Sequence, residues 1–67
     1  MVAVSSVVIK DLDYNPDTFD LIVTFANGAR WKYKDVPNDV YNNFLNAHSA
    51  GNFFHNNIKN GFDGEPV

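Results

Sequence analysis

Three cations alternate along one short segment and are the side chains most able to do chemistry in this sequence. Arg30, Lys32 and Lys34 occupy every second position. In a β-strand all three would point to one face at intervals of roughly 7 Å, comparable to the phosphate spacing of a nucleic acid strand. The same pattern fits a solvated sheet face, because lysine on a strand discourages edge pairing. The pattern therefore allows two interpretations: the three cations bind a nucleic-acid backbone, or they form a solvated face of the sheet.

Catalysis and metal binding find little support among the other polar residues. His48 and His55 are the two histidines, and no carboxylate lies at a spacing that would complete a metal site with them. Ser49 stands where a helix N-cap is expected, and Ser5 and Ser6 fall in a predicted strand. No glycine-rich phosphate loop is present. We therefore expect no enzyme activity, no metal and no small-molecule cofactor.

The composition is that of a small, foldable chain. Of its 67 residues 45% are hydrophobic and 15% aromatic, so aromatic bulk substitutes for core size. The absence of cysteine fits a reducing compartment, and no apolar run reaches the length of a membrane span. Residues 1–10 lack the basic start and long apolar core of an export signal. We expect one domain over residues 1–67, with residues 63–67 frayed, in the cytoplasm and without a membrane segment.

The charge is unevenly distributed. The formal net charge is −3, whereas proteins that bind nucleic acid mainly through electrostatics are usually basic. Three of the five cations fall within residues 30–34. The acids collect at Asp11, Asp13, Asp17, Asp20, Asp63 and Glu65. The total charge argues against nucleic-acid binding, and the local charge allows it.

One hairpin must position the alternating cations. Residues 19–25 and 29–34 alternate between apolar and polar, and Asn27-Gly28 lies between them. Asn-Gly flanked by such segments is the strongest short-range hairpin signal. Residues 2–12 are rich in β-branched side chains and are predicted to form a further strand, connected through a turn at residues 14–18. The expected sheet is a three-stranded antiparallel meander.

The hairpin register follows from which side chains would be buried together. A two-residue turn would place Lys32 on the same face as Val23 and bury its charge. A three-residue loop, residues 26–28 with Gly28 left-handed, instead pairs Val23 with Trp31. We predict the second register. It puts Phe19, Leu21, Val23, Phe25, Trp31 and Tyr33 on one face, and Arg30, Lys32 and Lys34 on the other beside Asp20, Ile22 and Thr24.

Two short helices are predicted to cover the aromatic face. Pro37 suits a first helical turn, and apolar residues recur at helical spacing over residues 40–47. Ser49 is a favourable N-cap for a second helix, which Asn60-Gly61 is predicted to end with a left-handed cap. The expected fold class is α+β in the order β-β-β-α-α, with both helices packed on one face of the sheet.

Two runs of residues carry a family resemblance. One is Trp31-Lys32-Tyr33-Lys34-Asp35-Val36-Pro37, and the other follows the pattern Ser-x-Gly-x-Phe-Phe over residues 49–54. With the residues around them, from about Ser6 to Phe62, they resemble the KTSC domain. That module occurs at the C-terminus of some lysyl-tRNA synthetases and as free-standing bacterial and phage proteins. The resemblance implies a stand-alone module of this type, and the attachment to a tRNA enzyme suggests RNA binding.

The second predicted helix departs from the family pattern. Family members often carry Lys or Arg after the serine, after the glycine and around the isoleucine. These positions are Ala50, Asn52, Asn56 and Asn57 here, which leaves Lys59. An RNA-contacting helix without those cations would lose most of its sequence-independent affinity.

The sequence leaves two functions open. One is a non-catalytic binding module for RNA or another nucleic acid. The other is a protein-interaction module, an accessory or phage protein that docks on a larger complex, which the small size and acidic charge suit. Edge-strand pairing would make the chain a weak dimer, and otherwise we expect a monomer. For either function the candidate binding residues are Arg30, Lys32, Tyr33, Lys34, Ser49, Asn52, His55 and Lys59.

Overall fold

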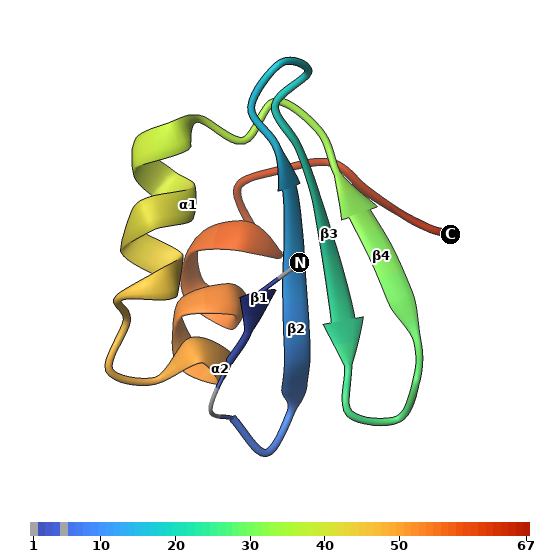
Figure 1. Ribbon diagram of the computed structural model, residues 1–67, viewed down its shortest axis with the longest axis vertical. Coiled ribbons are helices and arrows are strands. Elements are labelled where there is room, and N and C mark those ends of the chain that lie inside the picture. The colour runs from blue at the N-terminus through green and yellow to red at the C-terminus, as the bar shows by residue number, and fades with distance from the viewer. Residues whose placement is uncertain (1, 5) are drawn as a thin grey trace.

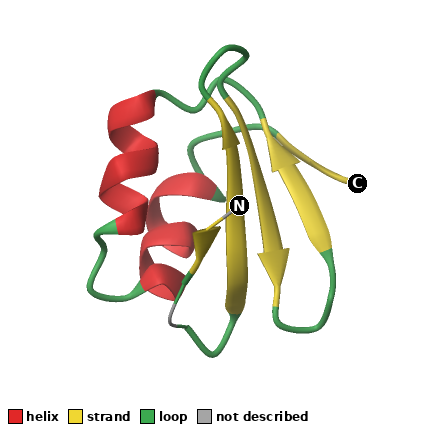
Figure 2. Ribbon diagram, in the orientation of Figure 1, coloured by secondary structure: helices red, strands yellow, loops and turns green. Residues whose placement is uncertain are grey.

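Five antiparallel strands form one sheet in sequence order, with the helices on one of its faces (Figures 1 and 2). The computed structural model describes residues 2–4 and 6–67, so the strand assignment expected for Ser5 lies outside the described residues. The strands are β1 (Val2–Ala3), β2 (Ile9–Asn15), β3 (Asp20–Phe25), β4 (Arg30–Tyr33) and β5 (Gly64–Pro66). The helices are α1 (Asn38–Leu45), α2 (Ala50–Phe53) and the π-helical turn η1 (Phe54–Ile58). The α+β class is confirmed.

The β3–β4 hairpin has the predicted register. Val23 pairs with Trp31, and Gly28 has a φ of 90°. The Phe25 N–H donates to the carbonyl of Ala29 at 2.8 Å, and the Gly28 N–H donates to the carbonyl of Phe25 at 2.9 Å. These bonds close a loop over residues 26–28. Because side chains alternate along a strand, this register turns Trp31 toward the helices and its two neighbours away from them.

The core lies between the sheet and the helices. Its buried residues are Ile9, Leu12, Leu21, Val23, Tyr33, Val36, Phe44, Ala50 and Ile58. Aromatic pairs extend it: Phe44 stacks on Phe53 with ring centroids 5.2 Å apart, and Tyr14 stacks on Tyr41 at 4.4 Å. Such pairs contribute about 0.5–1.5 kcal/mol beyond their buried area. Aromatic packing compensates for the small number of buried side chains.

The sheet has five strands rather than the expected three, and the N-terminal difference comes from one serine. The expected strand over residues 2–12 is two strands, because the chain turns back on itself before β2. The Oγ of Ser6 accepts the backbone N–H of Val8 at 3.1 Å and that of Ile9 at 3.3 Å. A serine hydroxyl that bonds nearby amides in this way stabilises a turn rather than a continuous strand. β1 therefore pairs antiparallel with β2.

The expected frayed tail, residues 63–67, instead forms β5. Gly64 pairs with Tyr33, and Pro66 with Trp31. The Lys34 N–H donates to the carbonyl of Asp63 at 3.1 Å, on the same side of β4. The expectation of fraying is wrong because it considers only apolar side chains. Pairing satisfies backbone groups of β4 that would otherwise line an open sheet edge.

Phe19 lies outside the apolar face to which the alternation assigned it. β2 continues to Asn15, and Phe19 belongs to the turn before β3, with a φ of 63° and a side chain 47% exposed. Its N–H donates to the carbonyl of Asn15, and its carbonyl accepts the N–H of Val36, both at 2.8 Å. These two bonds hold the left-handed conformation, which turns the side chain away from the core.

The helices begin where the sequence predicts, and the second ends differently. Pro37 immediately precedes α1, and the Oγ of Ser49 caps α2 by accepting the N–H of Asn52 at 3.3 Å. The predicted left-handed cap at Gly61 is wrong, since Gly28 is the left-handed glycine of the described chain. The amides of Gly61 and the next residue both donate to the carbonyl of Ile58, so the helix end is satisfied without it.

Candidate functional site

The three alternating cations lie on the sheet face away from the helices, where carboxylates balance them. Lys32 Nζ is 3.6 Å from Asp20 Oδ2, and Lys34 Nζ is 3.4 Å from Glu65 Oε1. The register places four acids on this face: Asp11, Asp13, Asp20 and Glu65. Exposed ion pairs are worth only about 0–1 kcal/mol, but they cancel positive potential. This outer face is mixed in charge and is poorly suited to following a phosphate backbone.

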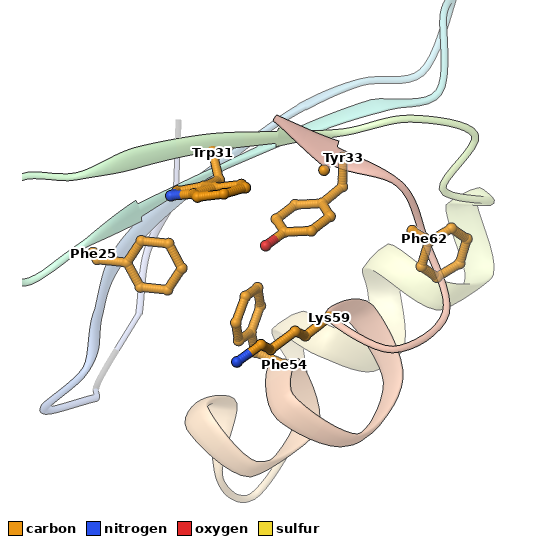
Figure 3. Close-up of a pocket in the computed structure, with 7 residues that line it drawn as sticks. Phe25, Trp31, Tyr33, Phe54, Lys59 and Phe62 are labelled. Carbon is orange, nitrogen blue, oxygen red and sulfur yellow. The ribbon is translucent and has the colours of Figure 1, made fainter. Parts of the chain in front are cut away.

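The inner face of β3 and β4 opens into a cavity of about 420 Å³ (Figure 3). It is lined by Phe25, Trp31, Tyr33, Phe54, Lys59, Phe62 and Gly64, and we call it the aromatic cavity. The residues come from the sheet on one side and from η1 and the segment after it on the other. Its volume is that of a site for a small ring system.

Phe54 fixes the walls of the aromatic cavity. Its ring meets Phe25 edge-to-face at 5.2 Å and Tyr33 edge-to-face at 5.6 Å. Trp31 and Tyr33 share a strand face, with ring centroids 6.5 Å apart and planes 24° apart. Edge-to-face contacts are a preferred geometry for aromatic rings, so each ring restricts its neighbours. The cavity is therefore formed before any ligand arrives.

The polar groups of the aromatic cavity can all donate hydrogen bonds. Figure 3 shows the Tyr33 hydroxyl directed into the cavity and the Lys59 amine beside Phe54. The phenol of Tyr33 is protonated at neutral pH, and burial raises its pKa further above the ordinary value. The indole N–H of Trp31 and the Lys59 ammonium donate only. No hydrogen bond or ion pair joins these three groups to another described residue. An acceptor-bearing ligand fits this set.

A second recess, of about 560 Å³, adjoins the aromatic cavity and shares Phe54 and Lys59 with it. We call it the polar recess; it is lined by Ser6, Val7, Val8, His48, Ser49, Ala50, Gly51, Asn52, Phe54, His55 and Lys59. Of the described residues that line either recess, none is Asp or Glu. The negative charge of the chain therefore lies elsewhere, and Lys59 faces both recesses without a carboxylate among their walls.

The predicted binding residues divide between two faces of the molecule. Arg30, Lys32 and Lys34 lie on the outer face. The other five line the aromatic cavity or the polar recess: Tyr33, Ser49, Asn52, His55 and Lys59. Sequence reasoning missed the walls formed by Phe25, Phe54 and Phe62, because alternation and helical spacing assign them to the core. The available signal was the number of aromatic residues, which is larger than two short helices can cover.

The described residues also bear on metal binding and on membrane association. No group of three His, Cys, Asp or Glu side chains among them could hold a metal ion. No helix in the described part of the chain has both the length and the hydropathy to cross a bilayer.

Comparisons with known proteins agree with the fold. The family model for the KTSC domain matches residues 5–62. An uncharacterized protein from Stutzerimonas stutzeri (strain A1501) is 36% identical over 58 residues, which covers 87% of this chain and 82% of that protein. The crystal structure of a KTSC domain protein from Yersinia pestis is similar, with a TM-score of 0.93 and 34% identity, over 97% of this chain and 92% of the other.

Proposed function

The chain belongs to the KTSC domain family, and we propose that it is a small non-catalytic binding module that holds single-stranded RNA at the aromatic cavity. The observation that carries this proposal is the cavity itself, with aromatic walls, donor groups and no carboxylate. Stacking of a base on an aromatic side chain is worth about 1–3 kcal/mol and tolerates any base. Lys59 supplies a cation for the adjoining phosphate. We further propose that the protein, which contains no cysteine, is a monomer in the cytoplasm.

The outer face is not the proposed contact. Its cations are balanced by acids, so a phosphate backbone laid across it would meet carboxylates as well as ammonium groups. Affinity at the aromatic cavity comes mainly from stacking, with one or two phosphates near Lys59. For single strands the logarithm of affinity falls with the logarithm of salt concentration by about 0.7 for each phosphate contact. We therefore expect a shallow salt dependence.

Fluorescence anisotropy of a labelled oligouridylate at low salt tests the proposal. Lys59→Glu should weaken binding about tenfold or more, because it replaces a charge-assisted contact by repulsion. Arg30→Glu changes the net charge by the same amount on the outer face, and its affinity should stay within about twofold of wild type. Absence of binding by the wild-type chain, or equal losses in the two variants, would overturn the proposal.

A protein-interaction module is the second candidate, and exposed valines favour it. Val7 is 93% exposed and Val8 49%, side by side at the rim of the polar recess. A partner's apolar side chains could pack there, as they do at the centre of many interfaces. Pulldown with the wild-type chain should then recover a protein that Val7→Asp does not. Recovery of nucleic acid alone by both chains would rule this candidate out.

A further inference from the structure

The Tyr33 hydroxyl is a polar group that the protein itself leaves unpartnered. The residue is 5% exposed, and the hydroxyl points into the aromatic cavity (Figure 3). No described residue hydrogen-bonds to it. Among the described residues Asp11 Oδ1 is the buried side-chain polar atom that lacks a partner, so the Tyr33 hydroxyl still reaches solvent through the open side of the aromatic cavity. An acceptor on a ligand in the cavity can therefore replace that solvent at the hydroxyl.

Tyr14 shows how the same fold satisfies a tyrosine when no ligand is needed. Its hydroxyl donates to the carbonyl of Val36 at 2.6 Å, and its ring stacks on Tyr41. Tyr14 takes no part in lining the aromatic cavity or the polar recess. The Tyr14 hydroxyl thus has its acceptor within the chain, whereas the Tyr33 hydroxyl has none among the described residues. Tyr14 serves as an internal reference for Tyr33.

Lys59 links the aromatic cavity to a surface suited to an anion. The polar recess beyond it is lined by His48, Ser49, Asn52 and His55, which can all donate hydrogen bonds. No carboxylate lies among its described walls. A ligand with a ring and an attached anion could place the ring in the aromatic cavity and the anion on the far side of Lys59.

We infer that the unit recognised is one nucleotide with its phosphate. The base stacks on Trp31, with the steeply inclined ring of Phe54 beside it, and accepts a hydrogen bond from the Tyr33 hydroxyl through a carbonyl on its edge. The phosphate lies in the polar recess against Lys59 and His55. This inference rests on the proposed function and deepens it: a mononucleotide should bind without a neighbouring nucleotide on either side.

Two-dimensional ¹H–¹⁵N NMR titration with uridine monophosphate, uridine and inorganic phosphate tests the inference. Uridine monophosphate should shift amides around both recesses and bind about tenfold more tightly than uridine, which lacks the charge-assisted contact. Uridine should shift the aromatic cavity alone, and phosphate the polar recess alone. If oligouridylate binds but uridine monophosphate does not, the inference fails and the proposed function stands. If neither binds, both fail.

Two tyrosine variants separate recognition from folding. Tyr33→Phe should weaken binding of uridine monophosphate about fivefold, the effect of one hydrogen bond, without lowering the melting temperature. Tyr14→Phe should lower the melting temperature and leave binding unchanged. Wild-type affinity in Tyr33→Phe would overturn the inference. Should Tyr33→Phe fail to fold, Lys59→Gln takes its place, because Lys59 is exposed and its substitution does not disturb the core. Its affinity for uridine monophosphate should fall about fivefold, while its affinity for uridine stays the same. Equal effects on both ligands would overturn the inference.

Discussion

The ring of Tyr33 lies directly against the Cα of Gly64 across the β4–β5 pairing. A β carbon at residue 64 would lie 2.8 Å from Cδ1 and 2.9 Å from Cζ of that ring, well inside van der Waals contact. Gly64 is also a wall of the aromatic cavity. The C-terminal strand therefore closes one side of the candidate site as well as the edge of the sheet, and the position of the Tyr33 ring depends on it.

Gly64→Val should separate β5 from β4 or displace the Tyr33 ring. Overpacking of this kind costs about 1–3 kcal/mol, and we expect a matching fall in the free energy of unfolding by urea. Affinity for oligouridylate should fall with it. Glu65→Ala is the control on the same strand, because it removes only the exposed pair with Lys34 and should change stability by less than about 1 kcal/mol. Unchanged amide exchange of β5 in Gly64→Val would contradict this account of the strand.

Ser6→Ala tests the turn that separates β1 from β2. The variant removes an acceptor shared by two backbone N–H groups, and we expect a loss of about 1 kcal/mol in the free energy of unfolding. Amide exchange at Ala3 and Val4 should rise, while exchange in β3 should not. Ser49→Ala offers a comparison at a helix cap, where a similar loss should affect α2 instead. Protection of β1 at the wild-type level would show that Ser6 does not hold the turn.

Tyr14→Phe should cost about 0.5–1.5 kcal/mol of stability, because the carbonyl of Val36 loses its donor. Tyr41→Phe is the matched control in the same stacked pair, since its hydroxyl forms no hydrogen bond with any residue that the structure describes. Thermal unfolding of both variants gives the comparison. Equal losses in the two would mean that the Tyr14 hydroxyl contributes nothing beyond its ring.

Alkaline pH should destabilise the chain through its three tyrosines. Burial raises the pKa of all three. For Tyr14 the negative charge of Asp39 adds a smaller effect, and for Tyr41 Asp13 and Tyr14 add smaller effects. The folded state thus holds these protons more tightly than the unfolded state, whose tyrosines titrate near pH 10. Their contribution is intact below pH 10 and is lost as pH rises through the folded pKa values. In the folded chain, tyrosinate absorbance should therefore rise with a midpoint above pH 10. A midpoint at or below pH 10 would contradict the raised pKa values of the tyrosines.

The central hairpin could be predicted from the sequence because side-chain chemistry fixed its register. Of the two-residue and three-residue loops, only the second keeps Lys32 away from Val23, and Gly28 supplies the left-handed residue that this loop requires. The cap at Ser49 was predictable for the same reason, since a hydroxyl beside the first helical turn has one obvious use. Where burial or capping leaves a single solution, local sequence determines local structure.

The outer strands and the aromatic cavity could not be predicted from local sequence. β5 pairs through its backbone, and its residues 64–66 carry no alternating pattern that would predict a strand. Alternation predicts which way Trp31 faces, but not how much of it two short helices cover. The sequence therefore brought out Tyr33 and Lys59 as candidates, whereas only the fold reveals that they face a shared cavity.

The emission of Trp31 reports whether RNA occupies the aromatic cavity. It is the single tryptophan of the chain, and it forms a wall of the aromatic cavity. Titration with oligouridylate at low salt should quench this emission in a saturable way, because a base stacks on the indole. The quenching should require higher RNA concentrations in Lys59→Glu and the same concentrations in Arg30→Glu. Unchanged Trp31 emission at RNA concentrations that saturate the anisotropy signal would show that RNA binds elsewhere and would contradict the account.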